Sequence, residues 1–166
     1  MTGMATKSII RIVLILLVIT INIGCDQFSK KMVKRSVLPY ETIHVLSDHL
    51  TVTRVENSGA FLSAGDSMSK ASKKIFLTLI PIVAMVLGMF YLFLKPVSGN
   101  MLIGLCFVIG GGVGNLFDRI LYGSVTDFLY VKFGIFQTGI FNIADVSIMT
   151  GMFLICLQFF KKSRPQ

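Results

Sequence analysis

Four of the eight acidic residues in this 166-residue chain lie at the edges of long apolar runs. Asp26 ends the first run, Asp118 ends the third and Asp145 lies inside the fourth, while Asp127 follows shortly after Asp118. A carboxylate at bilayer depth costs roughly 2.5–3.5 kcal/mol on insertion scales, so each acid needs a compensating partner or a function. Pairing with a basic group would explain any one of them alone. Four at one edge favour a functional site.

Asp118 has a basic neighbour in the sequence. Asn115 and Asp118 are three residues apart and share a helical face, and the adjacent Arg119 could bind a carboxylate through two hydrogen bonds. We therefore expect Asp118 to be ionised, paired and structural. The glycines just before it, Gly110 and Gly114, form a small-xxx-small pattern that lets another helix approach closely. The run lacks the Lys-Ser/Thr of a phosphate loop.

Asp127 and Asp145 have no adjacent basic residue, Lys132 being the nearest to Asp127. Two carboxylates within a few ångströms cannot both ionise cheaply, so one pKa is raised and the pair supplies one acid and one base. Such a pair can activate a water and protonate a leaving amine, as in aspartic peptidases. His44 and His49 are isolated histidines, and no His/Cys cluster has the spacing of a metal site. We expect neither a metal nor another cofactor.

The elements that must position these acids are membrane helices. Hydrophobic residues make up 54% of the chain and charged residues 14%, with a mean hydropathy of +0.78, whereas soluble domains average about 25% charged. This composition excludes a disordered chain, a disulfide scaffold and an ordinary soluble domain. A helix needs about 20 apolar residues to span the hydrocarbon layer. Four spans are predicted within a single membrane domain, at about residues 8–25, 75–94, 96–117 and 139–160.

Two segments outside these spans, about residues 36–70 and 120–135, are predicted to be β-rich. Leu50–Val55 and Gly123–Val131 alternate apolar and polar residues, as half-buried strands do. Each segment follows an odd-numbered span, so both lie on one side of the membrane. The fold class is therefore an all-α bundle of four transmembrane helices with a small β-rich platform. The Lys/Arg count favours a cytoplasmic first loop, but a long folded loop weakens that rule, so orientation stays open.

Two further features bear on processing and packing. The net charge of +8 indicates contact with anionic lipid headgroups and not with nucleic acid, because the basic residues flank the apolar spans.

Gly24-Cys25 resembles a lipoprotein cleavage site. However, the apolar run continues directly into Asp26, so we expect the first helix to be retained. Cys25, Cys106 and Cys156 are expected to be buried small hydrophobic residues. Pro81 is a candidate kink in the second span.

Taken in order, five blocks of the chain resemble the lipoprotein signal peptidase (signal peptidase II) family. The blocks are Asp26-Gln27 with Ser29-Lys30, Asn57-Ser-Gly-Ala-Phe61, Gly114-Asn115 with Asp118-Arg119, Val125 with Asp127-Phe128, and Phe141-Asn142 with Ala144-Asp145. The resemblance covers nearly the whole chain. It implies an aspartic endopeptidase that removes the signal peptide from diacylglyceryl-modified prolipoproteins by cleavage before the lipidated cysteine.

The resemblance also implies roles for individual residues. Asp127 and Asp145 would be the catalytic dyad. The residues that would line the site and hold the substrate backbone or the dyad are Asn57, Gly59, Asn115, Arg119 and Asn142. Asp26 and Lys30 would brace the first span against the platform, with Asp118 as further structural support. From the substrate's chemistry, we also expect its lipid chains to stay in the bilayer against the apolar bundle, with the Gly-rich third span making room.

The location implied by the resemblance is the bacterial cytoplasmic (inner) membrane. The platform and active site would face away from the cytoplasm, with both termini inside, which overrules the Lys/Arg count. The expected partners are lipidated prolipoproteins and membrane lipid, without nucleic acid, and the expected state is a monomer.

Two other functions are consistent with intramembrane acids. A small transporter or ion pathway could use them as a relay, but four spans without internal repeats are few for a transporter. A structural assembly factor could use acid–Arg pairs to join helices, but this would leave Asp127 and Asp145 without matching bases.

Overall fold

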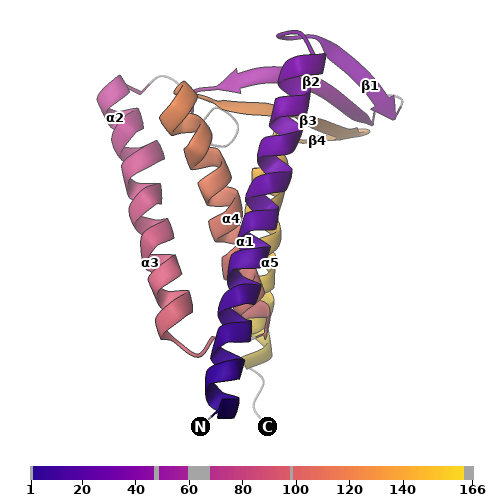
Figure 1. The fold of residues 1–166 in the computed structure, drawn as a ribbon. Coiled ribbons are helices and arrows are strands. Elements are labelled where there is room, and N and C mark those ends of the chain that lie inside the picture. The colour runs from indigo at the N-terminus through magenta and orange to yellow at the C-terminus, as the bar shows by residue number, and fades with distance from the viewer. Residues whose placement is uncertain (1, 47–48, 60–67, 98, 163–166) are drawn as a thin grey trace.

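The computed structural model describes residues 2–46, 49–59, 68–97 and 99–162. Within these residues, four helical segments are long and apolar enough to cross a membrane. They are α1 (Thr2–Ser36), the continuous helix formed by α2 (Lys70–Lys74), η2 (Ile75–Leu79) and α3 (Ile80–Leu94), then α4 (Gly99–Tyr122) and α5 (Ile143–Lys162). They form an elongated bundle with both ends of the chain at its lower end (Figure 1).

A four-stranded antiparallel sheet covers the other end of the bundle (Figure 1). Its order is β1 (Thr42–Leu46), β2 (Leu50–Asn57), β3 (Val125–Phe133) and β4 (Phe136–Gln137). The strands predicted from alternation at Leu50–Val55 and Gly123–Val131 correspond to β2 and β3. Pairing of β2 with β3 joins two segments that are separated in sequence by the second and third apolar helices, with Val55 opposite Asp127. Of the expected β-rich segment 36–70, residues 47–48 and 60–67 lie outside the described residues, and Lys70 already begins a helix.

Helix α4 is the centre of the bundle, and its glycines explain why. A Cβ at Gly110 would lie 2.7 Å from Asn22 of α1, and one at Gly114 would lie 2.6 Å from Asp26. On another side, a Cβ at Gly111 would collide with the backbone of Ala144 in α5. The predicted close helix approach at Gly110 and Gly114 is confirmed. The expectation that glycines leave room for lipid chains is wrong at these three positions, because α1 and α5 fill the space.

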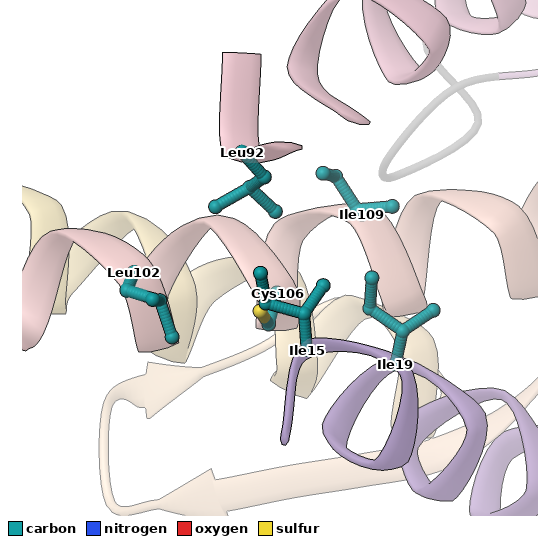
Figure 2. Close-up of a cluster of buried hydrophobic side chains, with 6 residues drawn as sticks. All are labelled: Ile15, Ile19, Leu92, Leu102, Cys106 and Ile109. Atoms are coloured by element: carbon teal, nitrogen blue, oxygen red, sulfur yellow. The ribbon is translucent and has the colours of Figure 1, made fainter. Parts of the chain in front are cut away.

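The hydrophobic core lies where α1, α3 and α4 meet, toward the end of the bundle opposite the sheet. Its buried members are Ile15, Ile19, Leu92, Leu102, Cys106 and Ile109 (Figure 2). Of the three cysteines, only Cys106 is buried; Cys25 and Cys156 are exposed on the outer faces of their helices, so the expectation of three buried cysteines is wrong for these two. In a membrane helix the outer face meets lipid, where a thiol needs no protein cover.

The helix that carries α3 is the least packed of the four. Only 6% of its most apolar 18-residue stretch is buried inside the protein, compared with 50% of the corresponding stretch of α4. Its irregularity is a π-helical turn, Ile75–Leu79, which ends just before Pro81. Proline cannot donate a backbone hydrogen bond, and π-helical turns are frequent at functional sites. The turn lies at the end of the bundle that carries the sheet (Figure 1).

Candidate active site

Strand β3 brings Asp127 to the interface between the sheet and the helices. Its first half is buried, including Val125, Thr126 and Phe128, because this part of the strand is covered by both β2 and the helix bundle. Asp127 is only 4% exposed. A carboxylate in such a position must find hydrogen-bond donors or take up a proton.

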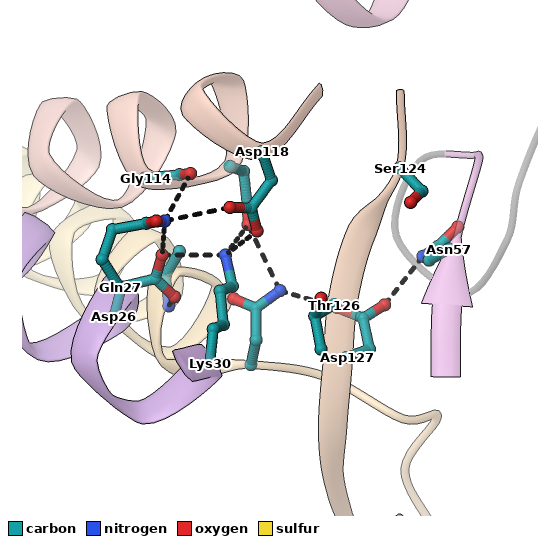
Figure 3. A network of polar contacts seen from close by, with 12 residues as sticks. Asp26, Gln27, Lys30, Asn57, Gly114, Asp118, Ser124, Thr126 and Asp127 are labelled. Atoms are coloured by element: carbon teal, nitrogen blue, oxygen red, sulfur yellow. Dashed lines mark hydrogen bonds and ion pairs between the residues drawn. The ribbon is translucent and has the colours of Figure 1, made fainter. Parts of the chain in front are cut away.

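Two side-chain amides hold Asp127. Asn57, at the end of β2, donates from Nδ2 to Oδ2 at 2.8 Å (Figure 3). Asn142 donates from Nδ2 to Oδ1 at 2.6 Å. These bonds favour the ionised form, but burial outweighs them, and the negative charge of Asp145 acts in the same direction as burial. The pKa of Asp127 is therefore raised from 3.8 to about 6.

The first turn of α5 positions Asp145. Asn142 precedes the helix, and its Oδ1 accepts a hydrogen bond from the Asp145 amide at 3.0 Å, while Asp145 Oδ2 accepts from the Asn142 amide at 3.1 Å. This reciprocal pattern is a capping box with aspartate in place of the usual glutamate or glutamine. The preceding Phe141 is bonded to β3 through Leu129, in both directions. Sheet and helix thus fix the second carboxylate together.

The two carboxylates are joined through asparagine side chains. Asn142 contacts both of them, and Asn115 of α4 donates from Nδ2 to Asp145 Oδ1 at 2.9 Å. Asn115 Oδ1 in turn accepts from Asn142 at 3.2 Å. Because each asparagine side chain has a donor and an acceptor, these two can link the acids without an intervening charge. The structure therefore brings together Asp127, Asp145, Asn57, Asn115 and Asn142.

Asp118 pairs with Lys30, not with Arg119 as predicted. Lys30 Nζ lies 2.9 Å from Asp118 Oδ2 and 2.8 Å from Asp26 Oδ2, and it also donates to Asn115 Oδ1 at 2.9 Å (Figure 3). Lys30 is 2% exposed, Asp26 0% and Asp118 1%. Adjacent residues on a helix point in different directions. For this reason Asp118 forms its ion pair with a lysine on another helix and not with Arg119.

The expected bracing role of Asp26 and Lys30 needs a second correction. They tie α1 to α4 and α5 rather than to the sheet: Asp26 Oδ1 accepts the backbone amide of Ala144 at 2.9 Å. Gln27 completes this network by donating to Asp26, to Asp118 and to the carbonyl of Gly114 (Figure 3). Gln27 is a functional residue that was not predicted, although its place beside Asp26 in the sequence was a usable signal.

Arg119 faces the two candidate catalytic acids. Its charge interacts with Asp145 and Asp127, and also with Asp118. The two candidate catalytic acids are therefore closer to a positive charge than their neighbours in the sequence suggest. Its Nη2 donates to the carbonyl of Gly59 at 3.0 Å, and Gly59 donates its amide to Asn57 Oδ1 at 2.8 Å. Arg119 Nε is buried and has no hydrogen-bond partner within the described part of the chain. Phe61, in the same sequence block, lies outside the described residues.

Two cavities border the acid pair, one at each carboxylate. One, of about 700 Å³, lies on the sheet and is lined by Asp127 and Asn57 together with Thr51, Thr53 and Tyr130. The other, of about 540 Å³, lies among the helices and is lined by Asp145, Asn115 and Arg119 at its polar end. The rest of its wall is apolar and comes from α4, α5 and the helix containing η2: Phe76, Leu77, Pro81, Met85, Val108, Leu116, Ile148 and Met149.

Neither histidine is among the hydrogen-bond partners given above for the two acids within the described residues. His49 stacks on Phe133 with ring centroids 4.9 Å apart, and its Nδ1 lies 3.0 Å from the carbonyl of Lys132. His44 lines the outer part of the sheet cavity. Across the described residues, no group of three or more His, Cys, Asp or Glu side chains could hold a metal ion.

Comparisons with known proteins agree on one family. The family model described as Signal peptidase (SPase) II matches residues 14–161. A lipoprotein signal peptidase of Clostridioides difficile is 34% identical over 91% of this chain and 99% of its own length. One from Syntrophus aciditrophicus is 32% identical over 85% and 88%. A solved bacterial membrane enzyme, 24% identical, shares the fold with a TM-score of 0.80 over 92% of each chain.

Proposed function

Since this chain belongs to the signal peptidase II family of aspartic peptidases, we propose that Asp127 and Asp145 are its catalytic dyad. The enzyme removes the signal peptide from diacylglyceryl-modified prolipoproteins, cutting before the lipidated cysteine. The observation that carries the dyad assignment is geometric. Both carboxylates bond to Asn142, and the pKa of Asp127 is raised by burial and by the charge of Asp145.

The two cavities support a path for the substrate across the dyad. A signal peptide is an apolar helix in the membrane, and the helix-side cavity that ends at Asp145 has apolar walls. The sheet-side cavity begins at Asp127 and has polar side chains such as Thr51 and Thr53. We place the signal segment on the helix side and the chain after the scissile bond on the sheet side. The bond itself then passes between the two aspartates.

The chemistry that fits this geometry is hydrolysis of a peptide bond by two carboxylates that share one proton. Burial makes Asp127 the proposed carrier of that proton, leaving Asp145 as the base. Asp145 takes a proton from a water as its oxygen attacks the scissile carbonyl carbon, and Asp127 donates its proton to the carbonyl oxygen. Collapse of the tetrahedral species breaks the C–N bond and protonates the leaving amine. The water supplies OH to the carbonyl carbon and H to the nitrogen, and the pair regains one proton.

The surrounding polar residues fit supporting roles. Asn57, Asn115 and Asn142 fix the carboxylates and carry amides that can also satisfy an unwound peptide backbone. Arg119 adds a positive charge beside two acids and holds the chain at Gly59. The Asp26–Lys30–Asp118 network sets the position of Asn115 and of the first turn of α5. One chain supplies every one of these residues, in keeping with a monomeric enzyme.

We place the protein in the bacterial inner membrane with the sheet and dyad at the extracytoplasmic face and both termini in the cytoplasm. Four membrane-length helices put both termini at one end and the sheet at the other (Figure 1). Lipid modification and signal-peptide removal act on exported precursors, so a site on the exported side meets its substrate directly.

The experiment for this function uses purified protein and a prolipoprotein bearing its diacylglyceryl group. Incubation is expected to release the signal peptide at the same rate with and without a chelator such as EDTA. A matched precursor whose modified cysteine is replaced by serine controls for the lipid requirement. Release that stops when the chelator is added would contradict the two-aspartate chemistry.

A further inference from the structure

The distribution of basic residues leaves one feature that peptide cleavage does not explain. Residues 26–74 carry eight Lys/Arg against five Asp/Glu, although cytoplasmic loops are the ones usually enriched in Lys and Arg. Some of these cations have identified contacts: Lys30 lies in the buried network, Lys34 lies 4.0 Å from the centre of the Tyr122 ring, and Arg54 pairs with Glu56. Lys70, Lys73 and Lys74 cluster at the start of a membrane-length helix.

These three lysines line a third cavity, which adjoins the helix-side cavity at Leu77 and Arg119. It has a volume of about 700 Å³ and lies between the helix containing η2 and the end of α4. Its polar lining consists of Lys70, Lys73, Lys74, Arg119, Ser58 and Thr78, and no acidic residue contributes among the described residues. Lys73 Nζ donates to Ser58 Oγ at 2.7 Å, which holds that lysine against the wall. The cavity therefore concentrates positive charge.

The cavity also borders the apolar outer surface of the bundle. Leu77 and Ile120 contribute apolar side chains to its lining, and Ile120 is 61% exposed. Leu79 and Ile80, which follow in the same helix, are 55% and 50% exposed. A site with cations beside aliphatic side chains, next to an exposed apolar helix surface, matches a molecule with a phosphate group and hydrocarbon chains, at the depth where headgroups meet acyl chains.

From this placement we propose that the cavity binds one anionic phospholipid, its phosphate held by Lys70 and Lys74 and its acyl chains lying along Leu77 and Ile120. Neither Lys70 nor Lys74 forms an ion pair within the described part of the chain. The proposed function argues against the substrate as the occupant, since a diacylglyceryl group carries no phosphate. A lipid in this site would lie beside Arg119, one of the residues of the candidate active site.

The test measures lipid binding by the full-length protein and does not depend on peptidase activity. Protein purified in a neutral detergent is titrated with phosphatidylglycerol or with phosphatidylcholine of the same chains, and bound lipid is counted by native mass spectrometry. One phosphatidylglycerol is expected to bind roughly tenfold or more tightly than phosphatidylcholine. Equal binding of the two lipids would overturn the proposal.

Two matched double variants locate the site. Lys70→Gln/Lys74→Gln is expected to abolish the preference for phosphatidylglycerol, and Lys70→Arg/Lys74→Arg is expected to keep it. Lys31→Gln/Arg35→Gln removes the same charge from exposed positions of α1 at the same end of the bundle and is expected to keep it too. Loss in both glutamine variants alike would overturn the proposal, because it would reflect net charge only.

A competition arm distinguishes lipid from free phosphate. Millimolar inorganic phosphate is expected to leave phosphatidylglycerol bound, since it lacks the acyl chains that contact Leu77 and Ile120. Displacement by inorganic phosphate at that concentration would contradict a lipid site and indicate a simple anion site. Thermal unfolding of each variant confirms that a lost preference is not a lost fold.

Discussion

Asp127 is the residue whose environment most directly sets the chemistry. Two asparagine amides stabilise its charge, yet its pKa is raised to about 6 because burial is the larger effect. An enzyme that needs one proton on the pair loses its active form once that proton leaves. We therefore expect kcat/KM to fall as pH rises through about 6, by about tenfold per unit, in a pH profile of prolipoprotein cleavage.

Removing a donor to Asp127 should move that decline in a known direction. The Asn57 hydrogen bond lowers the pKa of Asp127, so Asn57→Ala should raise that pKa. The descending limb of the pH profile of kcat/KM should then move to higher pH by about one unit. Glu56→Gln is the control, because Glu56 accepts hydrogen bonds from Thr126 and Ser124 and does not touch Asp127. A limb that moves to lower pH in Asn57→Ala would show that the donor assignment is wrong.

Sequence reasoning could find the acids but only part of their partners. Asp127 and Asp145 stood out because charge is expensive near hydrocarbon, and that argument needs no structure. The pairing of Lys30 with Asp118 depends on α1 and α4 lying side by side, which neither residue's neighbours reveal. Arg119 was assigned to the wrong acid because adjacency in sequence was taken for proximity, although neighbouring helix residues diverge.

At the scale of elements, the Asp26–Lys30–Asp118 network joins α1 to α4. Asp118→Asn leaves Lys30 with one buried carboxylate instead of two and should lower the unfolding free energy by about 3 kcal/mol. The measurement is thermal unfolding in detergent, with cleavage by the folded fraction largely retained. A double-mutant cycle with Lys30→Met should show strong coupling, whereas one with Arg119→Gln should show weaker coupling, because Arg119 acts on Asp118 through its charge and forms no ion pair with it. The reverse ranking would restore the pairing of Asp118 with Arg119.

The contact of α5 with α4 can be tested through a glycine. Gly111→Ala would drive a Cβ into the backbone of Ala144, next to Asp145, and should cost about 1–3 kcal/mol of stability and reduce cleavage. Gly24→Ala is the matched control, since a Cβ there meets nothing within 4 Å in the middle of α1. That variant should be neutral or slightly stabilising. Equal melting temperatures for the two variants would contradict the close approach.

The helices were easier to predict than the sheet's connections. Apolar runs of membrane length directly indicate transmembrane helices, and the alternation of apolar and polar residues located β2 and β3. The pairing of β2 with β3 could not be predicted from the sequence. Two membrane-length helices separate these strands in the chain, and the register depends on how the strands meet once the chain has returned to the same side. The extension of α1 to Ser36 was also missed: the helix continues past the apolar run, where Lys30 and Gln27 find partners on α4 and Asp26 accepts the Ala144 amide of α5.

For the whole molecule, the main prediction concerns orientation. In a background with Cys25, Cys106 and Cys156 replaced by serine, Ile135→Cys places a thiol in the highly exposed turn between β3 and β4, where Ile135 is 92% exposed. A membrane-impermeant maleimide should label it in cells with an intact inner membrane. Lys95→Cys, at the opposite end of α3, should react only after permeabilisation. The opposite labelling pattern would place the sheet in the cytoplasm.

The central claim is that Asp127 and Asp145 act as one catalytic unit, and the most direct measurement is turnover of lipid-modified prolipoprotein by the isosteric variants. Asp127→Asn and Asp145→Asn should each lose roughly 10³-fold or more in kcat, and the double variant should lose little more than either alone. Both single variants should unfold within a few degrees of the parent protein. Full activity in either folded variant would contradict the account.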